Sequence, residues 1–188
     1  MNVRSNKKDK IFETTLELIA ERGLHNTPMS LITKRSEISA GTIYHYFESK
    51  EKLINELYLE IKRMVLMNVM KDDDAQKPYK DRFFAIWSAY YDYLAGNPNT
   101  LSFMEQCSSI PVISEETREL AEEIASPLLN FFSFGIEKGI LKQTDIKLVL
   151  SLIHGSIISI AKLHISGQFT ITKEHLNSAI DYSWKGLT

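Results

Sequence analysis

The sequence predicts an all-α protein of about nine helices, and two observations lead to this fold class. Apolar side chains recur at helical spacing in almost every segment, whereas the strict alternation that indicates a strand is scarce. The 188 residues include only 8 Gly and 5 Pro, and 44% of them are apolar, which is typical of a globular chain with one or two compact domains. The predicted helices cover residues 8–22, 28–35, 39–46, 50–70, 79–95, 99–108, 115–138, 145–166 and 173–185.

Helix-stop and helix-start residues set the ends of the first helices. Gly23 is expected to end the first helix, because glycine adopts the left-handed backbone found there. Thr27 is expected to cap the second helix with its hydroxyl, and Pro28 to occupy the first helical position, where no amide hydrogen is needed. Ser39 and Ser49 are the expected caps of the next two helices.

Apolar stripes predict which face of each long helix is buried. In the first helix, one stripe is formed by Phe12, Leu16 and Ile19. In the helix over residues 50–70, the residues expected to face inward are Leu53, Leu57, Ile61, Met64 and Met67.

Two further segments interrupt the helical pattern. The run from Asp72 to Asp74 is expected to begin a solvated polar linker that ends near Pro78. Pro127 lacks an amide hydrogen, so it is expected to kink or split the helix over residues 115–138.

Charge is unevenly spread along the chain. The whole chain carries a net charge of −2, yet residues 1–53 hold nine Lys or Arg against seven Asp or Glu. A basic end on an acidic body orients a molecule toward a polyanion. The chain has a single Cys, which favours a reducing compartment. Glu13 and Glu17 interrupt the first apolar stretch and argue against a signal peptide. No uncharged apolar run reaches the ~18–20 residues of a membrane helix. We therefore expect a cytoplasmic protein with no membrane partner.

Residues 28–46 have the pattern of a helix-turn-helix, two short helices joined by a tight turn. Ile43 and Phe47 are expected to face inward and to pack on Ile32 and Phe12. The second helix has the size that the major groove of B-DNA admits. Its remaining side chains offer hydroxyl and imidazole donors that suit phosphates and base edges.

The run from Thr27 to Leu53 resembles the DNA-binding segment of the TetR/AcrR family of bacterial transcriptional regulators. The resemblance rests on the core Gly41-Thr42-Ile43-Tyr44-His45-Tyr46-Phe47 and on the following Ser49-Lys50-Glu51. It implies an N-terminal three-helix head, with a DNA-binding domain over residues 1–48. It also implies a helical ligand-binding and dimerisation body over residues 49–188.

The resemblance also implies, by position, which residues contact DNA. Tyr44, His45 and Lys50 match phosphate-contacting residues, and Thr27 matches a contact to the DNA backbone. The residues that match positions near base edges are Ser30, Ala40, Gly41 and Thr42. Lys7 and Lys8 are expected to reach the flanking backbone.

Two positions depart from the family pattern. Glu37 stands in the turn where the family usually has Gly, and a left-handed backbone there costs a Glu ~1 kcal/mol. Ala40 replaces a commonly polar or basic residue, and this departure counts against a base contact from that position. Both departures leave open an alternative function, a small-molecule binding or interaction protein without functional DNA binding.

Residues 148–161 carry no charged side chain, and a helix that is apolar all round is buried on every side. Such a helix is either central in the monomer or completes its burial against a second copy. Gly155, Ser156 and Ser159 are small enough for close helix approach. The resemblance implies the second arrangement, a homodimer through helices 145–166 and 173–185 that reads a pseudo-palindromic operator in double-stranded DNA.

The helix over residues 79–95 is rich in aromatic rings, which are either plain core or the wall of a ligand site. The resemblance implies a cavity for a small-molecule effector among the helices over 50–70, 79–95, 99–108 and 115–138. The residues expected to contact the ligand are Trp87, Tyr91, Phe103, Met104, Phe131 and His154.

No arrangement of residues indicates catalysis, a metal or a cofactor. The histidines show no metal-ligand spacing, and neither a Gly-rich phosphate loop nor a nucleophile elbow is present. Cys107 has no basic neighbour within four positions, so its thiol is expected to be inert. His154 is expected to be either a hydrogen-bonded core or interface histidine or a hydrogen-bond donor to a ligand. The sequence therefore predicts a non-enzymatic, ligand-responsive transcriptional regulator, a repressor released from its operator by a small, largely apolar or aromatic molecule.

Overall fold

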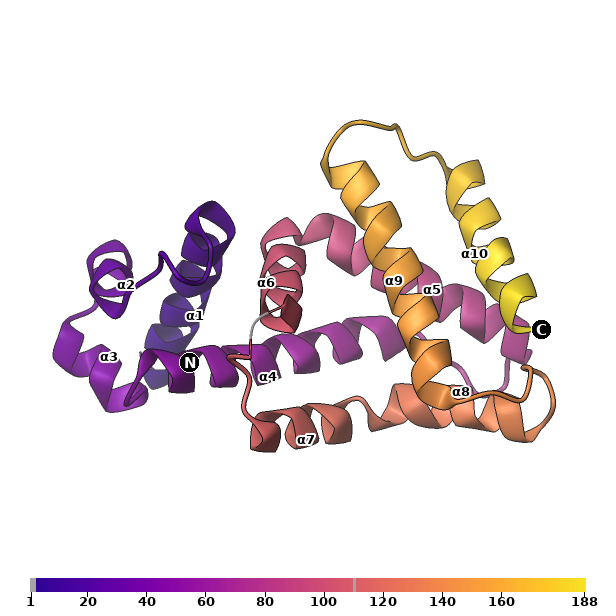
Figure 1. The fold of residues 1–188 in the computed structure, drawn as a ribbon, viewed down its shortest axis with the longest axis horizontal. Helices are drawn as coiled ribbons and strands as arrows, with labels where there is room; N and C mark the ends of the chain where they lie inside the picture. The colour runs from indigo at the N-terminus through magenta and orange to yellow at the C-terminus, as the bar shows by residue number, and fades with distance from the viewer. Residues whose placement is uncertain (1–2, 110) are drawn as a thin grey trace. The chain divides into compact units, whose positions relative to one another are not determined.

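The computed structural model describes residues 3–109 and 111–188, and these residues form ten helices and no strand. The helices are α1 (Val3–Arg22), α2 (Met29–Ser36), α3 (Ala40–Tyr46), α4 (Lys50–Met70), α5 (Tyr79–Gly96), α6 (Pro98–Ser109), α7 (Glu115–Ile124), α8 (Ser126–Glu137), α9 (Ile146–Ile165) and α10 (Lys173–Leu187) (Figure 1). The predicted all-α class is confirmed.

The helix count exceeds the nine predicted because the segment over 115–138 forms two helices. α7 ends at Ile124, and α8 begins at Ser126 with Pro127 in its first turn. The predicted split at this proline is confirmed, because the first turn is the place where a helix tolerates a residue without an amide hydrogen. α1 differs from the prediction by beginning at Val3 rather than at Lys8.

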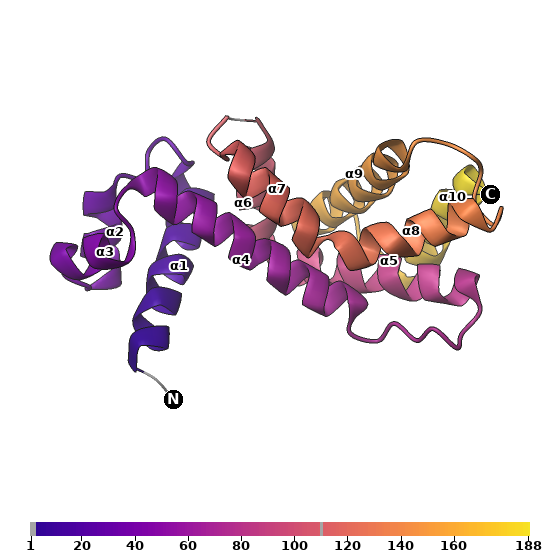
Figure 2. The same ribbon diagram turned by 90° about the horizontal axis from the view of Figure 1, so that it is seen from below.

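The chain divides into two compact units. The head unit comprises the described residues up to Ile61 together with residues 99–121. The body unit comprises residues 62–98 and 122–188. α4 is one continuous helix that contributes its first part to the head unit and its last part to the body unit (Figure 2).

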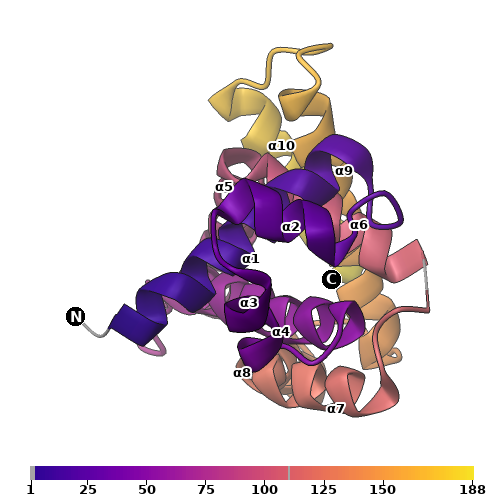
Figure 3. The ribbon, with the colours of Figure 1, turned by 90° about the vertical axis from the view of Figure 1, so that its left-hand side faces the viewer.

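α1, α2 and α3 enclose a small apolar core within the head unit (Figure 3). The four side chains predicted to form this core, Phe12, Ile32, Ile43 and Phe47, are all buried. The rings of Phe12 and Phe47 lie with their centroids 5.4 Å apart. The inner face predicted for the helix-turn-helix is therefore confirmed.

The loop between α1 and α2 is closed differently from the prediction. Gly23 ends α1 as expected, with a φ of 82° and its N–H donating to the Ile19 carbonyl at 2.8 Å. The predicted cap by Thr27 is wrong, since Pro28 occupies the N-cap position of α2. The Thr27 hydroxyl donates instead to the Gly23 carbonyl at 2.9 Å, which holds the loop together and takes the hydroxyl away from α2.

The caps predicted for α3 and α4 are confirmed. The Ser39 hydroxyl accepts a hydrogen bond from the Thr42 N–H at 3.3 Å. The Ser49 hydroxyl accepts one from the Lys52 N–H at 3.1 Å. Each cap satisfies a first-turn amide that has no partner within its own helix.

α6 is hydrogen-bonded to the end of α1 inside the head unit through one amide side chain. Gln106 of α6 accepts a hydrogen bond from the Leu24 N–H at 2.8 Å and donates one to the Ile19 carbonyl at 3.2 Å. This single side chain thus satisfies the Leu24 N–H and gives the Ile19 carbonyl a second hydrogen bond beside the one that it accepts from Gly23.

The buried stripe of α4 departs from the prediction in its second half. The buried apolar residues of α4 are Leu53, Ile54, Leu57, Ile61, Val65 and Val69. Met64 and Met67 were expected to face inward, but they are 46% and 72% exposed. The stripe continues from Ile61 in steps of four residues, and this places both methionines on the solvent side.

α5, α8, α9 and α10 pack together in the body unit, and α9 crosses α5 (Figure 1). The core of the body unit contains Phe83 and Trp87 of α5, Phe132 of α8, and Ile157 and Ala161 of α9, which are all almost entirely buried. This core confirms that the aromatic face of α5 points inward.

The linker before α5 is not solvated throughout, contrary to expectation. Arg82 of α5 donates two hydrogen bonds, both of 2.8 Å, to the two carboxylate oxygens of Asp73. These hydrogen bonds lower the pKa of the Asp73 carboxyl. A bidentate pair fixes the linker to the first turn of α5, nine residues further along the chain.

α9 leaves much of its apolar surface uncovered. Leu148 and Leu152 are 52% and 58% exposed, although Val149, Ile153 and Ile157 are buried. The monomer therefore does not bury this helix on every side. By length and composition alone α9 is also apolar enough to cross a membrane, with 22% of its most apolar window buried, but these are properties that a core helix shares.

Candidate functional site

The turn between α2 and α3 requires a left-handed residue, and Glu37 provides it. Its φ is 58° and its ψ is 24°, and within residues 3–109 and 111–188 no other non-glycine residue has a positive φ. Its carboxylate is exposed to solvent, 3.8 Å from the ammonium of Lys10. Both helices form normally on either side of this turn, so Glu37 in place of Gly leaves the helix-turn-helix intact.

α3 and the start of α2 present small and polar residues to solvent. Ala40, Gly41 and His45 are exposed, and Tyr44 is 51% exposed, whereas Ile43 between them is fully buried. A Cβ atom added to Gly41 would meet nothing within 4 Å, which shows that this position faces open space. We call the surface formed by the following residues the α3 strip: Ser30, Ala40, Gly41, Thr42, Tyr44 and His45.

Two residues expected to contact DNA are instead engaged within the head unit. Thr27 is fully buried, and its hydroxyl is taken by the Gly23 carbonyl. The Lys50 ammonium donates a hydrogen bond to the Leu24 carbonyl, and burial lowers its pKa. An ammonium has three N–H donors, so Lys50 keeps donors beyond this bond.

The two lysines expected to reach the flanking DNA differ in their surroundings. Lys7 is exposed on α1. Lys8 is partly buried and pairs with Glu56 of α4 at 2.8 Å, with its ammonium 5.3 Å from the centroid of the Phe12 ring. This pair connects α1 to α4 across the edge of the head core.

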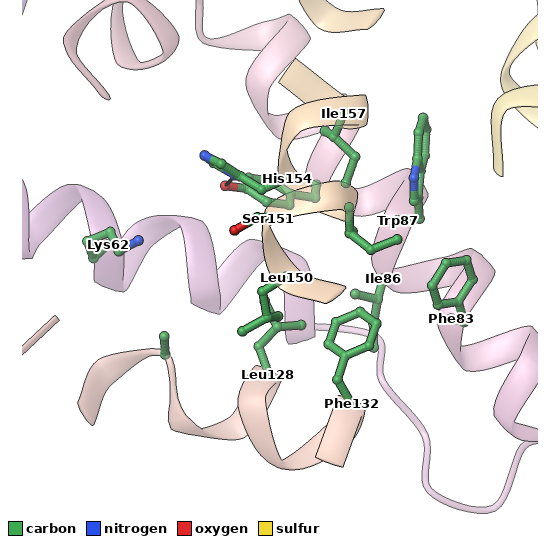
Figure 4. Close-up of a pocket in the computed structure, with 13 residues that line it drawn as sticks. Lys62, Phe83, Ile86, Trp87, Leu128, Phe132, Leu150, Ser151, His154 and Ile157 are labelled. Atoms are coloured by element: carbon green, nitrogen blue, oxygen red, sulfur yellow. Dashed lines mark hydrogen bonds between the residues drawn. The ribbon is translucent and has the colours of Figure 1, made fainter. Parts of the chain in front are cut away.

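The body unit contains a cavity of about 250 Å³ (Figure 4). It is lined by Lys62, Phe83, Ile86, Trp87, Tyr90, Ala125, Leu128, Phe132, Leu150, Ser151, Ile153, His154 and Ile157. These residues come from α4, α5, α8 and α9 and from Ala125, which precedes α8. Three of the predicted segments, now α4, α5 and α8, therefore line the cavity. α9 takes the place of the predicted helix over residues 99–108.

Two of the six predicted ligand residues, Trp87 and His154, line this cavity. Tyr91 packs beside it, where its hydroxyl is hydrogen-bonded to Nδ1 of His164. The ring of Phe131 stacks on that of Tyr79, with centroids 4.4 Å apart. Phe103 and Met104 are buried on α6 in the head unit.

Polar groups are few in the cavity, and their surroundings differ. The Tyr90 hydroxyl lies 2.7 Å from Nδ1 of His154. Burial, and secondarily the charge of Lys62, lowers the pKa of His154 to about 4, so the imidazole is neutral at pH 7. Burial also lowers the pKa of Lys62. Trp87 is only 1% exposed, and its Nε1–H has no acceptor among the described residues.

Sequence reasoning missed Lys62, although a signal was available. Lys62 directly follows the buried Ile61 and lies three residues before the buried Val65. A cation beside the inward stripe of an amphipathic helix is a sign of a polar group near the core. Ser151 and Leu150 were missed because His154 was the one residue of α9 expected to contact the ligand, and the helix was otherwise assigned to dimerisation.

Neither the lone cysteine nor any metal cluster adds a reactive centre in the described residues. Burial raises the pKa of the Cys107 thiol to about 12, so the thiol is protonated and unreactive. Among residues 3–109 and 111–188, no group of three or more His, Cys, Asp or Glu side chains is placed to hold a metal ion.

Two family models match the chain. Residues 11–57 match the model described as bacterial regulatory proteins of the tetR family. Residues 78–188 match the model described as the tetracyclin repressor-like C-terminal domain. Together they cover the helix-turn-helix and most of the body unit.

Relatives of known sequence or structure agree with these matches. A helix-turn-helix-type transcriptional regulator of Haemophilus influenzae is 29% identical, over 95% of this chain and 94% of its own. A TetR family regulator from Marinobacter aquaeolei has the same fold, with a TM-score of 0.92 at 22% identity, over 100% of this chain and 98% of its own. The transcriptional regulator FadR from Bacillus subtilis, solved in complex with stearoyl-CoA, is 25% identical with a TM-score of 0.75, over 95% of this chain and 98% of its own.

The helix-turn-helix, the helical body with its cavity and the two family models agree with one another. The relatives belong to a class of proteins that regulate transcription rather than catalyse reactions. The chain therefore belongs to the tetR family of bacterial regulatory proteins and is a ligand-responsive, DNA-binding transcriptional regulator.

Proposed function

We propose that the protein is a cytoplasmic, homodimeric repressor that leaves its operator when a small, largely apolar or aromatic molecule occupies the body cavity. The observation that carries this proposal is the α3 strip, where exposed hydroxyl and imidazole groups lie around the fully buried Ile43. α3 has the size of a recognition helix. It lies at the surface of residues 1–48, which we propose as the DNA-binding domain.

Residues of the strip divide into two roles. The Tyr44 hydroxyl and the His45 ring donate to phosphates, as does Lys50 with the N–H groups it has left. Ser30, Ala40, Gly41 and Thr42 lie along the base edges of the major groove. Thr27 supports the strip from within, because its hydroxyl is engaged in the loop that positions α2.

α4 is the element that transmits ligand binding to the head. Lys62 of α4 lines the cavity, and Lys50, twelve residues earlier on the same helix, is hydrogen-bonded to the α1–α2 loop. Twelve residues of α-helix span about 18 Å. A ligand that favours one tilt of α4 moves the head with it and changes the spacing of the paired recognition helices.

The dimer forms through α9 and α10 within residues 49–188, the proposed ligand-binding and dimerisation domain. Exposed apolar residues on these helices include Leu148, Leu152 and Tyr182, which is 74% exposed. A second copy that covers this surface completes the burial of α9. Two heads held in this way engage half-sites ~34–36 Å apart, so a modest change in their spacing breaks simultaneous binding.

The proposed class of effector follows from the cavity walls. Phe83, Trp87 and Phe132 give it large apolar surfaces, which suit an apolar or planar molecule. The FadR relative, which holds stearoyl-CoA, supports an effector with a large apolar part.

A gel-shift assay with the DNA upstream of the protein's own gene tests DNA binding. Wild-type protein is expected to bind at low salt and to lose affinity steeply at higher salt, because phosphate contacts release counterions. Tyr44→Ala is expected to weaken binding to all sequences about equally, and Tyr44→Phe, the matched control, separates loss of the hydroxyl from loss of the ring. Thr42→Ala is expected to change the preference among operator variants.

Two results would contradict this proposal. An absence of binding at low salt favours the alternative, a small-molecule binding protein without DNA function. Equal losses on every operator variant for Thr42→Ala remove its base-edge role and leave it among the phosphate contacts.

A further inference from the structure

The charge of the cavity is one-sided. Among its thirteen described lining residues, Lys62 is a cation and none is acidic. In Figure 4, the amine of Lys62 is directed toward α9, where Ser151 and His154 lie on the side nearer to it. The remaining lining residues are apolar or aromatic apart from Tyr90, so a ligand meets one positive, polar end and an otherwise apolar wall.

The polar groups of the cavity are mainly hydrogen-bond donors. The Lys62 ammonium and the Trp87 indole can only donate. His154 has its Nδ1 beside the Tyr90 hydroxyl, and when that hydroxyl donates, the neutral ring carries its proton on Nε2 and is a third donor. A ligand with acceptor oxygens therefore pairs with the Lys62 ammonium and the Trp87 indole, which a ligand with donors alone does not.

Trp87 gives an independent sign of an occupant. Its Nε1–H is buried and has no acceptor among the described residues, although a buried donor without a partner costs stability. The indole lines the same cavity as Lys62. An oxygen atom of a bound molecule satisfies this group, and an aliphatic or purely aromatic hydrocarbon does not.

The cavity volume limits the size of the ligand. At about 250 Å³ it lies below the ~300–1,000 Å³ of pockets that hold drug-sized ligands.

We propose that the cavity binds a compact monocarboxylic acid that carries a further oxygen, with its carboxylate at Lys62 and His154, its apolar part against Phe83 and Phe132, and the further oxygen accepting from Trp87 Nε1. The inference rests on the effector site proposed above and names the chemistry of its ligand. It distinguishes this cavity from one that selects an amine, because a cationic ligand would be repelled by Lys62.

Isothermal titration calorimetry without DNA tests the proposal with three probes of equal chain length: octanoate, octan-1-ol and octylamine. Octanoate is expected to bind at least tenfold more tightly than octan-1-ol, and octylamine not to bind. Stearate is the probe of size and is expected to bind more weakly than octanoate. Tighter binding of octan-1-ol or octylamine than of octanoate overturns the carboxylate assignment, and tighter binding of stearate overturns the size limit.

Two variants test the ligand contacts proposed for Lys62 and Trp87. Lys62→Met is expected to abolish the preference for octanoate while leaving the affinity for octan-1-ol unchanged, which also shows that the cavity is folded. Lys71→Met, the control at an exposed lysine that does not line the cavity, keeps the preference. Trp87→Phe removes the N–H and is expected to weaken 8-hydroxyoctanoate about tenfold while leaving octanoate unchanged. Unchanged octanoate affinity in Lys62→Met, or unchanged 8-hydroxyoctanoate affinity in Trp87→Phe, contradicts the assigned contact.

A gel shift with octanoate separates this inference from the proposed function. Octanoate that binds in calorimetry but leaves the operator complex intact refutes the release mechanism and supports the ligand assignment. An operator complex that dissociates with octan-1-ol but not with octanoate refutes the ligand assignment and supports the release mechanism.

Discussion

The hydroxyl of Tyr90 lies 2.7 Å from Nδ1 of His154, and the two rings stack with centroids 5.6 Å apart. The neighbouring Tyr91 makes the same kind of bond to Nδ1 of His164. Two consecutive tyrosines of α5 thus hold two histidines of α9 that are ten residues apart. The crossing of these helices, on which the cavity depends, is therefore fixed by polar groups as well as by apolar packing.

The neutral His154 makes stability depend on pH. Its pKa is lowered to about 4 in the folded protein, from 6.5 in an exposed histidine. Between these values the unfolded chain binds the proton more readily, so the free energy of unfolding is highest above pH 6.5 and falls as the pH drops toward 4. The loss reaches at most about 3 kcal/mol. Urea unfolding at several pH values measures it.

His154→Phe is the matched variant for this pH dependence. It removes the titrating group and keeps an aromatic ring of similar size beside Tyr90. The slope of stability against pH between 6.5 and 4 is expected to be shallower in this variant. Identical slopes in the two proteins would mean that other groups, and not His154, bind the proton on unfolding.

Glu37→Gly is expected to stabilise the protein, because glycine adopts a φ of 58° without the steric cost that a Cβ imposes. The gain is about 0.5–1 kcal/mol after the greater freedom of glycine in the unfolded chain is subtracted. Thermal unfolding measures it. Glu37→Ala is the control, since it removes the carboxylate but keeps the Cβ, and an equal gain in this variant would assign the effect to charge.

Gly135→Ala is expected to destabilise the body unit by about 1–3 kcal/mol, since a Cβ there has no room. It would lie 2.6 Å from Cζ of Tyr79 and 2.9 Å from Cδ1 of Leu141. Tyr79 cannot yield easily, because its hydroxyl donates to the Phe131 carbonyl at 3.1 Å. Denaturant unfolding of Gly96→Ala, where the added Cβ meets nothing within 4 Å, gives the baseline, and similar losses in both variants would exclude the clash as the cause.

Leu152→Glu is expected to weaken dimerisation, because it places a charge on the exposed apolar surface of α9. The dissociation constant should rise ~30-fold, the size of an interface hot spot. Sedimentation equilibrium measures it. Met67→Glu changes an apolar residue on α4 that is more exposed still and lies outside the proposed interface, and it is expected to leave the dimer unchanged. A dimer that tolerates Leu152→Glu would place the interface elsewhere.

Much of the fold was predictable because its signals are local. Gly23, Ser39, Ser49 and Pro127 act on the helix ends nearest to them, and each does what its backbone chemistry predicts. The prediction that Thr27 caps α2 was wrong because its hydroxyl has two possible partners nearby, the amides of α2 and the Gly23 carbonyl four residues earlier. Sequence spacing alone does not decide between them.

The cavity was less predictable because it depends on contacts between distant segments. Trp87 and His154 were found from residue type, yet Phe103 and Met104, which are as apolar as the true lining, belong to the head unit. Nothing in the local pattern assigns an aromatic residue to one core rather than another. Asp73 likewise looked like part of a solvated run until its pairing with Arg82 placed it at the start of α5.

The two hydrogen bonds of Gln106 limit how the DNA-reading part can be transplanted. The end of α1 depends on an amide from α6, about eighty residues further along the chain. A fragment cut after α4, or a chimera that joins residues 1–70 to a foreign body, loses that amide. The loss leaves the Leu24 N–H to water and removes one of the two hydrogen bonds of the Ile19 carbonyl. Engineering a new sensor for this operator is therefore better done by redesigning the cavity than by exchanging everything beyond α4.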